Sequence, residues 1–76
     1  MTESGLYRHY KGGLYEVIGV ATHTESREPL VVYRDQLEGL LWVRPEAMFN
    51  DSISIGGASQ PRFRYIAASG RADVSG

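Results

Sequence analysis

The chain has 76 residues, 42% of them hydrophobic, and a formal net charge of −1, which together predict one small domain. The balanced charge argues against a protein that binds nucleic acid through a general excess of basic residues. The absence of cysteine excludes disulfides and thiolate metal sites, so an aromatic-rich core or oligomerisation is expected to supply the stability.

The first third of the chain predicts a β-hairpin. Residues 1–5 are polar and are expected to be frayed. The tyrosine-rich stretch 6–11 and the stretch 14–22, which is rich in β-branched residues, are both typical of strands. Gly12-Gly13 between them predicts a two-residue turn, because glycine accepts the positive φ angles that such a turn requires.

A two-residue turn at this place fixes the expected register of the hairpin. It pairs Tyr10 with Tyr15 and His9 with Glu16. Gly19 falls inside the second strand, where a glycine usually marks a bulge or a bend. A bulge would change which side chains face inward, so the apolar residues around Gly19 need not follow one strict alternation.

The middle of the chain predicts two more strands and a helical turn. Residues 30–34 and 40–44 are the third and fourth strands, with a charged turn at 35–39. Pro45 cannot donate a hydrogen bond to a sheet but suits the first turn of a helix. Residues 45–49 are therefore expected to form one helical turn that places Met48 and Phe49 against the sheet.

The last third predicts short strands followed by a tail. Residues 52–55 form a short segment that turns at Gly56-Gly57, and residues 61–66 alternate charged and aromatic side chains as a half-buried edge strand does. From residue 67 to residue 76 the chain consists mostly of small and polar residues, and this tail is expected to be disordered.

Five or six short strands separated by turn signals predict an all-β fold. The single helical turn at Pro45–Phe49 favours a small SH3-like barrel or roll over residues 6–66. A closed barrel is preferred to an open sheet, because closure removes the strand edges that so short a chain has little material to cover.

Several blocks of the chain resemble a bacterial family of short proteins, domain of unknown function 1653. The blocks are Tyr7–Gly12, Leu14–Ala21, Leu30–Tyr33, Leu41–Pro45, Met48-Phe49 and Pro61–Phe63. The resemblance covers about residues 6 to 66 and implies an SH3-like roll and a bacterial source. It implies no activity, cofactor or catalytic residue, since the family is uncharacterised.

The sequence offers no pattern typical of a catalytic or metal site. His9 and His23 are the only histidines, and their spacing is not that of metal ligands. No serine lies in a nucleophile elbow, and a barrel of this size is expected to leave little room for a pocket of roughly 300–1,000 Å3. We expect no metal or cofactor, and a small hydrolase using His9 and Glu16 is the least favoured hypothesis.

The arginines and aromatic residues form the more informative pattern. In the fourth strand Trp42 and Arg44 share one face, and Leu41 and Val43 share the other. If Leu41 and Val43 face inward, Trp42 and Arg44 form an exposed pair suited to cation–π contact or to partner binding. If Trp42 belongs to the core, Arg44 is expected to pair locally with an acidic residue.

A similar alternation follows in the last strand, where arginines share one face and aromatic residues the other. The candidate partner surface consists of Trp42, Arg44, Arg62, Arg64 and Arg34. The five tyrosines fit either a core with solvated hydroxyl groups or a surface groove for an extended or proline-rich peptide.

These features favour a non-enzymatic binding or interaction module whose partner is a protein, a peptide or a small anionic ligand. Binding of single-stranded nucleic acid or a nucleotide is the alternative, although the balanced charge does not favour it. A homo-oligomer is possible. No membrane association is expected, because no segment approaches about 20 apolar residues, and without cysteines or an export signal the expected location is cytoplasmic.

Overall fold

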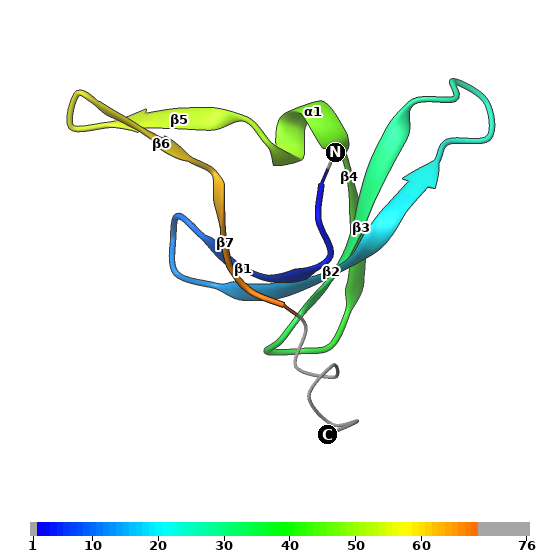
Figure 1. The fold of residues 1–76 in the computed structure, drawn as a ribbon, viewed down its shortest axis with the longest axis horizontal. Coiled ribbons are helices and arrows are strands. Elements are labelled where there is room, and N and C mark those ends of the chain that lie inside the picture. The colour runs from blue at the N-terminus through cyan, green and yellow to red at the C-terminus, as the bar shows by residue number, and fades with distance from the viewer. Residues whose placement is uncertain (1, 69–76) are drawn as a thin grey trace.

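The computed structural model describes residues 2–68, which form a curved antiparallel sheet, a separate hairpin and one helical turn (Figure 1). The elements are β1 (Gly5–His9), β2 (Leu14–Thr22), β3 (Pro29–Asp35), β4 (Leu41–Pro45), α1 (Glu46–Phe49), β5 (Ser52–Ile55), β6 (Ala58–Pro61) and β7 (Phe63–Ala67). The all-β fold and the position of the helical turn are therefore confirmed, with seven strands in residues 2–68 rather than five or six.

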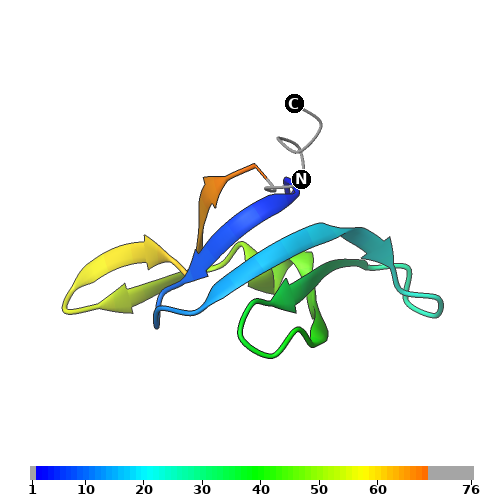
Figure 2. The same ribbon diagram turned by 90° about the horizontal axis from the view of Figure 1, so that it is seen from below.

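The main sheet is open rather than closed into a barrel. Its strand order is β4-β3-β2-β1-β7, so β4 and β7 lie at opposite edges, and β5 pairs with β6 in a second sheet. Figures 1 and 2 show the β5–β6 hairpin and the β2–β3 turn projecting at opposite ends of the molecule. The main sheet curves around α1, and we call the side that faces α1 the concave face and the other the convex face.

The core lies on the concave face and is mostly aromatic, as the composition predicted. Its buried residues are Tyr7, Val17, Val31, Tyr33, Phe49 and Phe63. The Phe49 ring, brought in by α1, stacks on Phe63 with 4.1 Å between ring centroids and 8° between ring planes. The Tyr7 ring meets the Phe49 ring edge-on and the Tyr33 ring meets it at a tilt, with centroid distances of 5.3 and 5.4 Å. Phe49 therefore joins the two arms of the curved sheet.

The predicted register of the first hairpin is wrong by three residues. Tyr7, not Tyr10, lies opposite Tyr15. The loop holds three residues, 10–12, and is closed by a 2.7 Å hydrogen bond from the His9 N–H to the Gly13 carbonyl. Gly12, the third loop position, has a φ of 108°, which is typical of a three-residue hairpin loop rather than a two-residue turn.

The corrected register separates His9 from Glu16. His9 lies opposite Phe63 of β7, on the concave face. Glu16 lies opposite Leu6, one position out of phase with the buried Tyr7, and so belongs to the convex face. The pairing on which the hydrolase hypothesis depended is therefore absent.

The predicted irregularity near Gly19 is confirmed. The pairing of β2 with β3 shifts between Val17 and Gly19, which leaves Ile18 as the extra residue of a β-bulge. Val17 is fully buried, Ile18 is half exposed, and Val20 packs against the core. Because of the bulge, Val17 and Val20, which are three residues apart, both contribute to the core.

Of the two alternatives for β4, the structure excludes the one in which Leu41 and Val43 face the core. Leu41 and Val43 are 57% and 59% exposed. Trp42 lies opposite the buried Tyr33, and Arg44 lies opposite the buried Val31, so both face the concave side. In residues 2–68 β4 is an edge strand, so Leu41 and Val43 have a neighbouring strand on one side only. Of Leu41, Val43, Met48 and Phe49, only Phe49 is a core residue.

The predicted frayed start also needs correction. Thr2 is buried, and both its backbone N–H and its hydroxyl donate to Glu46 Oε2, at 2.6 and 2.8 Å. These hydrogen bonds, first that of the hydroxyl, lower the pKa of the Glu46 carboxyl. Thr2 is thus tied to α1, the Glu3 carbonyl accepts from the Tyr7 hydroxyl at 2.7 Å, and β1 begins at Gly5. The predicted tail overlaps β7 at Ala67, and its residues 69–76 lie outside the described part of the chain.

Candidate ligand-binding groove

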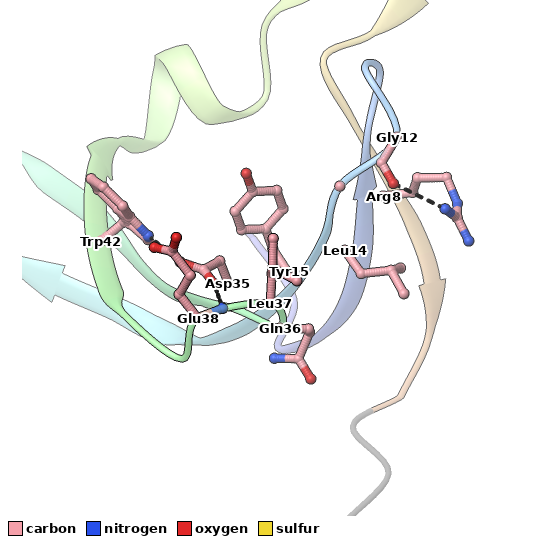
Figure 3. Close-up of a pocket in the computed structure, with 10 residues that line it drawn as sticks. Arg8, Gly12, Leu14, Tyr15, Asp35, Gln36, Leu37, Glu38 and Trp42 are labelled. Carbon is pink, nitrogen blue, oxygen red and sulfur yellow. Dashed lines mark hydrogen bonds between the residues drawn. The ribbon is translucent and has the colours of Figure 1, made fainter.

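A groove of about 560 Å3 lies where the β1–β2 turn and the β3–β4 turn meet at one end of the sheet (Figure 3). It is lined by Arg8, Gly12, Gly13, Leu14, Tyr15, Asp35, Gln36, Leu37, Glu38 and Trp42. Its volume falls within the roughly 300–1,000 Å3 of small-ligand pockets. The expectation that so small a domain leaves little room for a pocket is therefore wrong, because the open sheet leaves a hollow that a closed barrel would fill with side chains.

Trp42 forms one wall of this groove and is held by its polar edge. Its indole Nε1 donates to Asp35 Oδ2 at 2.9 Å, while the side chain remains 47% exposed. The bond from Trp42, followed by the backbone N–H of Glu38, lowers the pKa of the Asp35 carboxyl, which therefore stays charged at neutral pH. Trp42 thus lies on the core side of the sheet, but at the edge of the core, with part of its ring open to solvent.

Arg44 lies beside Trp42 on the concave face, two residues along β4. Its guanidinium lies 5.8 Å from the centroid of the Phe63 ring, within the range of a cation–π contact. Its Nε is 3.4 Å from the Tyr33 hydroxyl oxygen, which accepts a weak hydrogen bond. The aromatic core therefore positions a cation next to the groove.

Arg62 adds a second cation on the same side of the molecule. It occupies the bend between β6 and β7, and its Nη2 lies 3.8 Å from Asp51 Oδ2. Its Nε is buried and finds no hydrogen-bond partner among the described residues. The pKa of His9 is lowered by burial first and then by the charges of Arg44, Arg62 and Lys11. The cations thus converge around His9.

The other two predicted arginines lie apart from this group. Arg64 is exposed and lies opposite Arg8 across the β1–β7 pair, and Arg34 lies opposite Leu41 on the convex face. The expected alternation of Arg62 and Arg64 fails because Arg62 belongs to a bend and not to the strand. The structure therefore brings Trp42 and Arg44 together, with Arg62 nearby, but not the whole predicted set.

Three residues that line the groove were not in the predicted partner surface, although Tyr15 was among the tyrosines considered for a peptide groove. Tyr15 has edge contacts with the Tyr33 and Phe63 rings, and its side chain also lines the groove. Asp35 anchors Trp42, and Leu37 is 92% exposed at the tip of the β3–β4 turn. A leucine inside a charged turn was a visible signal for Leu37, whereas the role of Asp35 depends on the turn geometry.

Residues 2–68 hold neither a cluster of metal ligands nor a membrane-spanning helix. In that part of the chain no three His, Cys, Asp or Glu side chains gather closely enough to hold a metal ion. Its only helix is far too short to cross a membrane, and no other described segment forms a helix that could.

The fold and the groove define a small, open all-β domain with an aromatic and arginine-bearing concave face. The chain belongs to the family described as protein of unknown function (DUF1653), whose family model matches residues 5–65. It is similar to a crystal structure of a DUF1653 protein from Bordetella bronchiseptica, with 36% identity over 88% of this chain and 90% of the other and a TM-score of 0.81. The family resemblance is thus confirmed, and the bacterial source that it implies agrees with the organism of that crystal structure. The search of curated proteins found no match.

The lowered pKa of His9 gives a prediction. Replacing Arg44 by glutamine removes a positive charge near the ring, so the pKa of His9 is expected to rise toward its ordinary value of 6.5. The matched variant Arg34→Gln removes the same charge on the convex face and should leave the pKa of His9 in place. NMR titration of the His9 ring protons checks both. An unchanged pKa in Arg44→Gln would mean that burial and the other two cations, without Arg44, lower it.

The same shift fixes the sign of a pH effect on stability. Because folding lowers the pKa of His9, the unfolded chain binds this proton more readily than the folded chain does. The stability contributed by neutral His9 is complete above pH 6.5 and is lost as the pH falls through the interval between 6.5 and the lower folded pKa. Arg44→Gln should narrow this interval.

Proposed function

We propose that this domain is a non-enzymatic binding module that holds an extended peptide in the groove. The observation that carries the proposal is the half-exposed Trp42, fixed by Asp35 at the wall of a groove of about 560 Å3. Tryptophan, tyrosine and arginine contribute most of the binding energy at protein interfaces, and all three meet here. The fold alone would not support this function, because similar folds serve many purposes.

The groove's chemistry indicates which side chains it would accept. The indole N–H of Trp42 is already bonded to Asp35, so its open ring offers apolar and π surface rather than a hydrogen-bond donor. Tyr15 and Leu37 extend this apolar surface. An aliphatic residue or a proline is therefore the expected contact, as in the aromatic grooves that bind extended proline-rich segments.

The charges around the groove would set the direction of the peptide. Arg44 lies on the concave face next to Trp42, whereas Glu38 lines the groove from the β3–β4 turn. A peptide with an acidic residue on one side of its apolar contact and a basic residue on the other matches this arrangement. We expect such charges to affect the specificity and the association rate of the peptide more than its affinity.

Selection from a display library of random short peptides, followed by calorimetry with the selected peptides, tests the proposal. Trp42→Ala is expected to weaken binding by about tenfold or more. Ile18→Ala is the matched control, because Ile18 is exposed to the same extent on the bulge of β2. Arg44→Gln should weaken peptides that carry an acidic residue, and Arg34→Gln should not. The absence of any enriched peptide, or equal binding by Trp42→Ala, would refute the proposal.

Single-stranded nucleic acid remains the alternative, because bases stack on exposed aromatic rings beside arginines. Titration of a thymidine oligonucleotide at two salt concentrations separates the two functions. The peptide proposal predicts little binding of the oligonucleotide. If the oligonucleotide binds, if binding requires Trp42 and if it weakens steeply with salt, nucleic acid and not a peptide is the ligand of the groove.

A further inference from the structure

The two edges of the main sheet differ in how they are protected. At β7 the pairing shifts between Leu6 and Tyr7, which leaves Ile66 as an extra residue, and Arg64 adds a charge. Such bulges and charges are common protection against edge-to-edge association. β4 pairs with β3 in unbroken register along its whole length and begins with three large, half-exposed apolar residues, Leu41, Trp42 and Val43. β4 is the outer strand at its end of the main sheet, next to β3.

Within residues 2–68, the outward backbone groups of β4 face no partner strand. Asp35 N–H donates to the Leu40 carbonyl at 3.0 Å, so Leu40 points its backbone groups toward β3. Hydrogen bonding alternates along an antiparallel pair, so Trp42 and Arg44 do the same, while Leu41, Val43 and Pro45 point their backbone groups outward. Pro45 thus occupies a position where its missing N–H costs no bond within the sheet.

We propose that β4 pairs in antiparallel fashion with β4 of a second copy of the chain, centred on Val43. Val43 then lies opposite the partner's Val43, and the two exchange a pair of backbone hydrogen bonds. Leu41 lies opposite the partner's Pro45 and donates to its carbonyl, and the symmetric bond forms on the other side. Four outward backbone hydrogen bonds therefore form without any rearrangement of the β3–β4 pair.

The side chains of β4 are complementary to themselves in this register, which favours a second copy over an unrelated strand. On the concave face Trp42 lies opposite the partner's Arg44, a cross-strand pair suited to cation–π contact. On the convex face Val43 lies opposite the partner's Val43 and Leu41 lies opposite the partner's Pro45, so apolar side chains contact apolar side chains. The pairing is isologous and closes after two copies, so it gives a dimer and not a fibre.

The dimer is compatible with the proposed groove but shares the side chains of Trp42 and Arg44 with it. The groove lies on the Tyr15 side of Trp42, toward β2, whereas the free edge lies on the opposite side. Two five-residue strands bury less than the roughly 1,600 Å2 of a standard interface. The dimer is therefore expected to dissociate on dilution.

Sedimentation equilibrium over a wide concentration range, together with amide hydrogen exchange, tests the pairing. The weight-average mass of the wild type should rise from one chain toward two, and the amides of Leu41 and Val43 should become protected as the concentration increases. Val43→Lys places two like charges opposite each other and should keep the protein monomeric. Ile18→Lys adds the same charge at another half-exposed apolar position and should still dimerise.

Val43→Pro provides a second, independent variant. It removes only the outward N–H at the centre of the pairing, so the monomer should fold and the dimer should be lost. A wild type that stays monomeric at the highest concentration, or a dimer that survives in both Val43 variants, would overturn the inference. Neither variant changes a groove residue, so the failure of this inference would leave the peptide proposal standing.

Discussion

Replacing Phe49 by alanine is expected to lower the free energy of unfolding by about 3–5 kcal/mol. Phe49 is 1% exposed, and its ring contacts Phe63, Tyr7 and Tyr33. These contacts join β1, β3 and β7 through α1, so the cavity would open at the centre of the core. A chain of this size is stable by only about 4–11 kcal/mol, so the variant should lose a large part of its stability and unfold at a much lower urea concentration than the wild type.

Met48→Ala is the matched control for this prediction. Met48 precedes Phe49 in the same helical turn but is 49% exposed, so its truncation should cost about 1 kcal/mol or less. Urea denaturation followed by circular dichroism measures both variants. Equal losses of stability in the two variants would mean that α1 stabilises the domain through its backbone rather than through the Phe49 ring.

Gly5→Ala is the second substitution with a large expected effect. Gly5 has a φ of 141°, a backbone conformation that residues with a Cβ rarely adopt, which alone costs about 1–3 kcal/mol. An added Cβ would also lie 2.7 Å from the Ala67 carbonyl oxygen and 3.0 Å from Tyr65 Cε1. The variant should therefore lose stability and loosen the β1–β7 pair first, because the contact lies on that side.

Gly19→Ala separates this effect from a general cost of replacing glycine. Gly19 does not have a positive φ, and an added Cβ there meets no atom within 4 Å. Its substitution is expected to change stability by less than about 1 kcal/mol. Denaturation curves and amide exchange in β7 check both variants. Normal exchange protection of β7 in Gly5→Ala would contradict the expected clash.

The strand positions, the helical turn and the Gly19 bulge could be predicted because they depend on short-range signals. Pro45 ends a strand and precedes a helical turn, and Gly56 and Gly57 both adopt the positive φ that their turn requires. The first hairpin shows the limit of this reasoning. Gly12-Gly13 fits two kinds of turn, and the choice between them depends on which tyrosine packs in the core, a contact between distant residues.

The open sheet could not be predicted from the same signals. Closure requires β4 to meet β7, and their separation depends on the sheet's curvature and on Phe49 packing against Phe63, not on any local pattern. The open sheet also determines the partial exposure of the Trp42 side chain. Alternation showed that Trp42 and Arg44 share a face, but in an open sheet the core face itself reaches solvent at the edge, so neither of the two expected alternatives was complete.

The candidate site, like the fold, could be predicted only where it depends on short-range signals. The pairing of Trp42 with Arg44 follows from strand periodicity within one segment. Tyr15, Asp35 and Leu37 join the groove only because two turns from different hairpins meet at one end of the sheet. Arg34 and Arg64 were grouped with Arg44 by residue type, and the register places them elsewhere.

The most direct test of the proposed function is an NMR titration with a library-selected peptide, observed at the indole N–H of Trp42. We predict saturable shifts at this indole and at the backbone amides of Tyr15 and Leu37, which line the groove. The amides of Ile18 and Arg34, which lie outside it, should shift little. Saturable shifts confined to the convex face, with the Trp42 indole unchanged, would contradict a peptide-binding groove at this site.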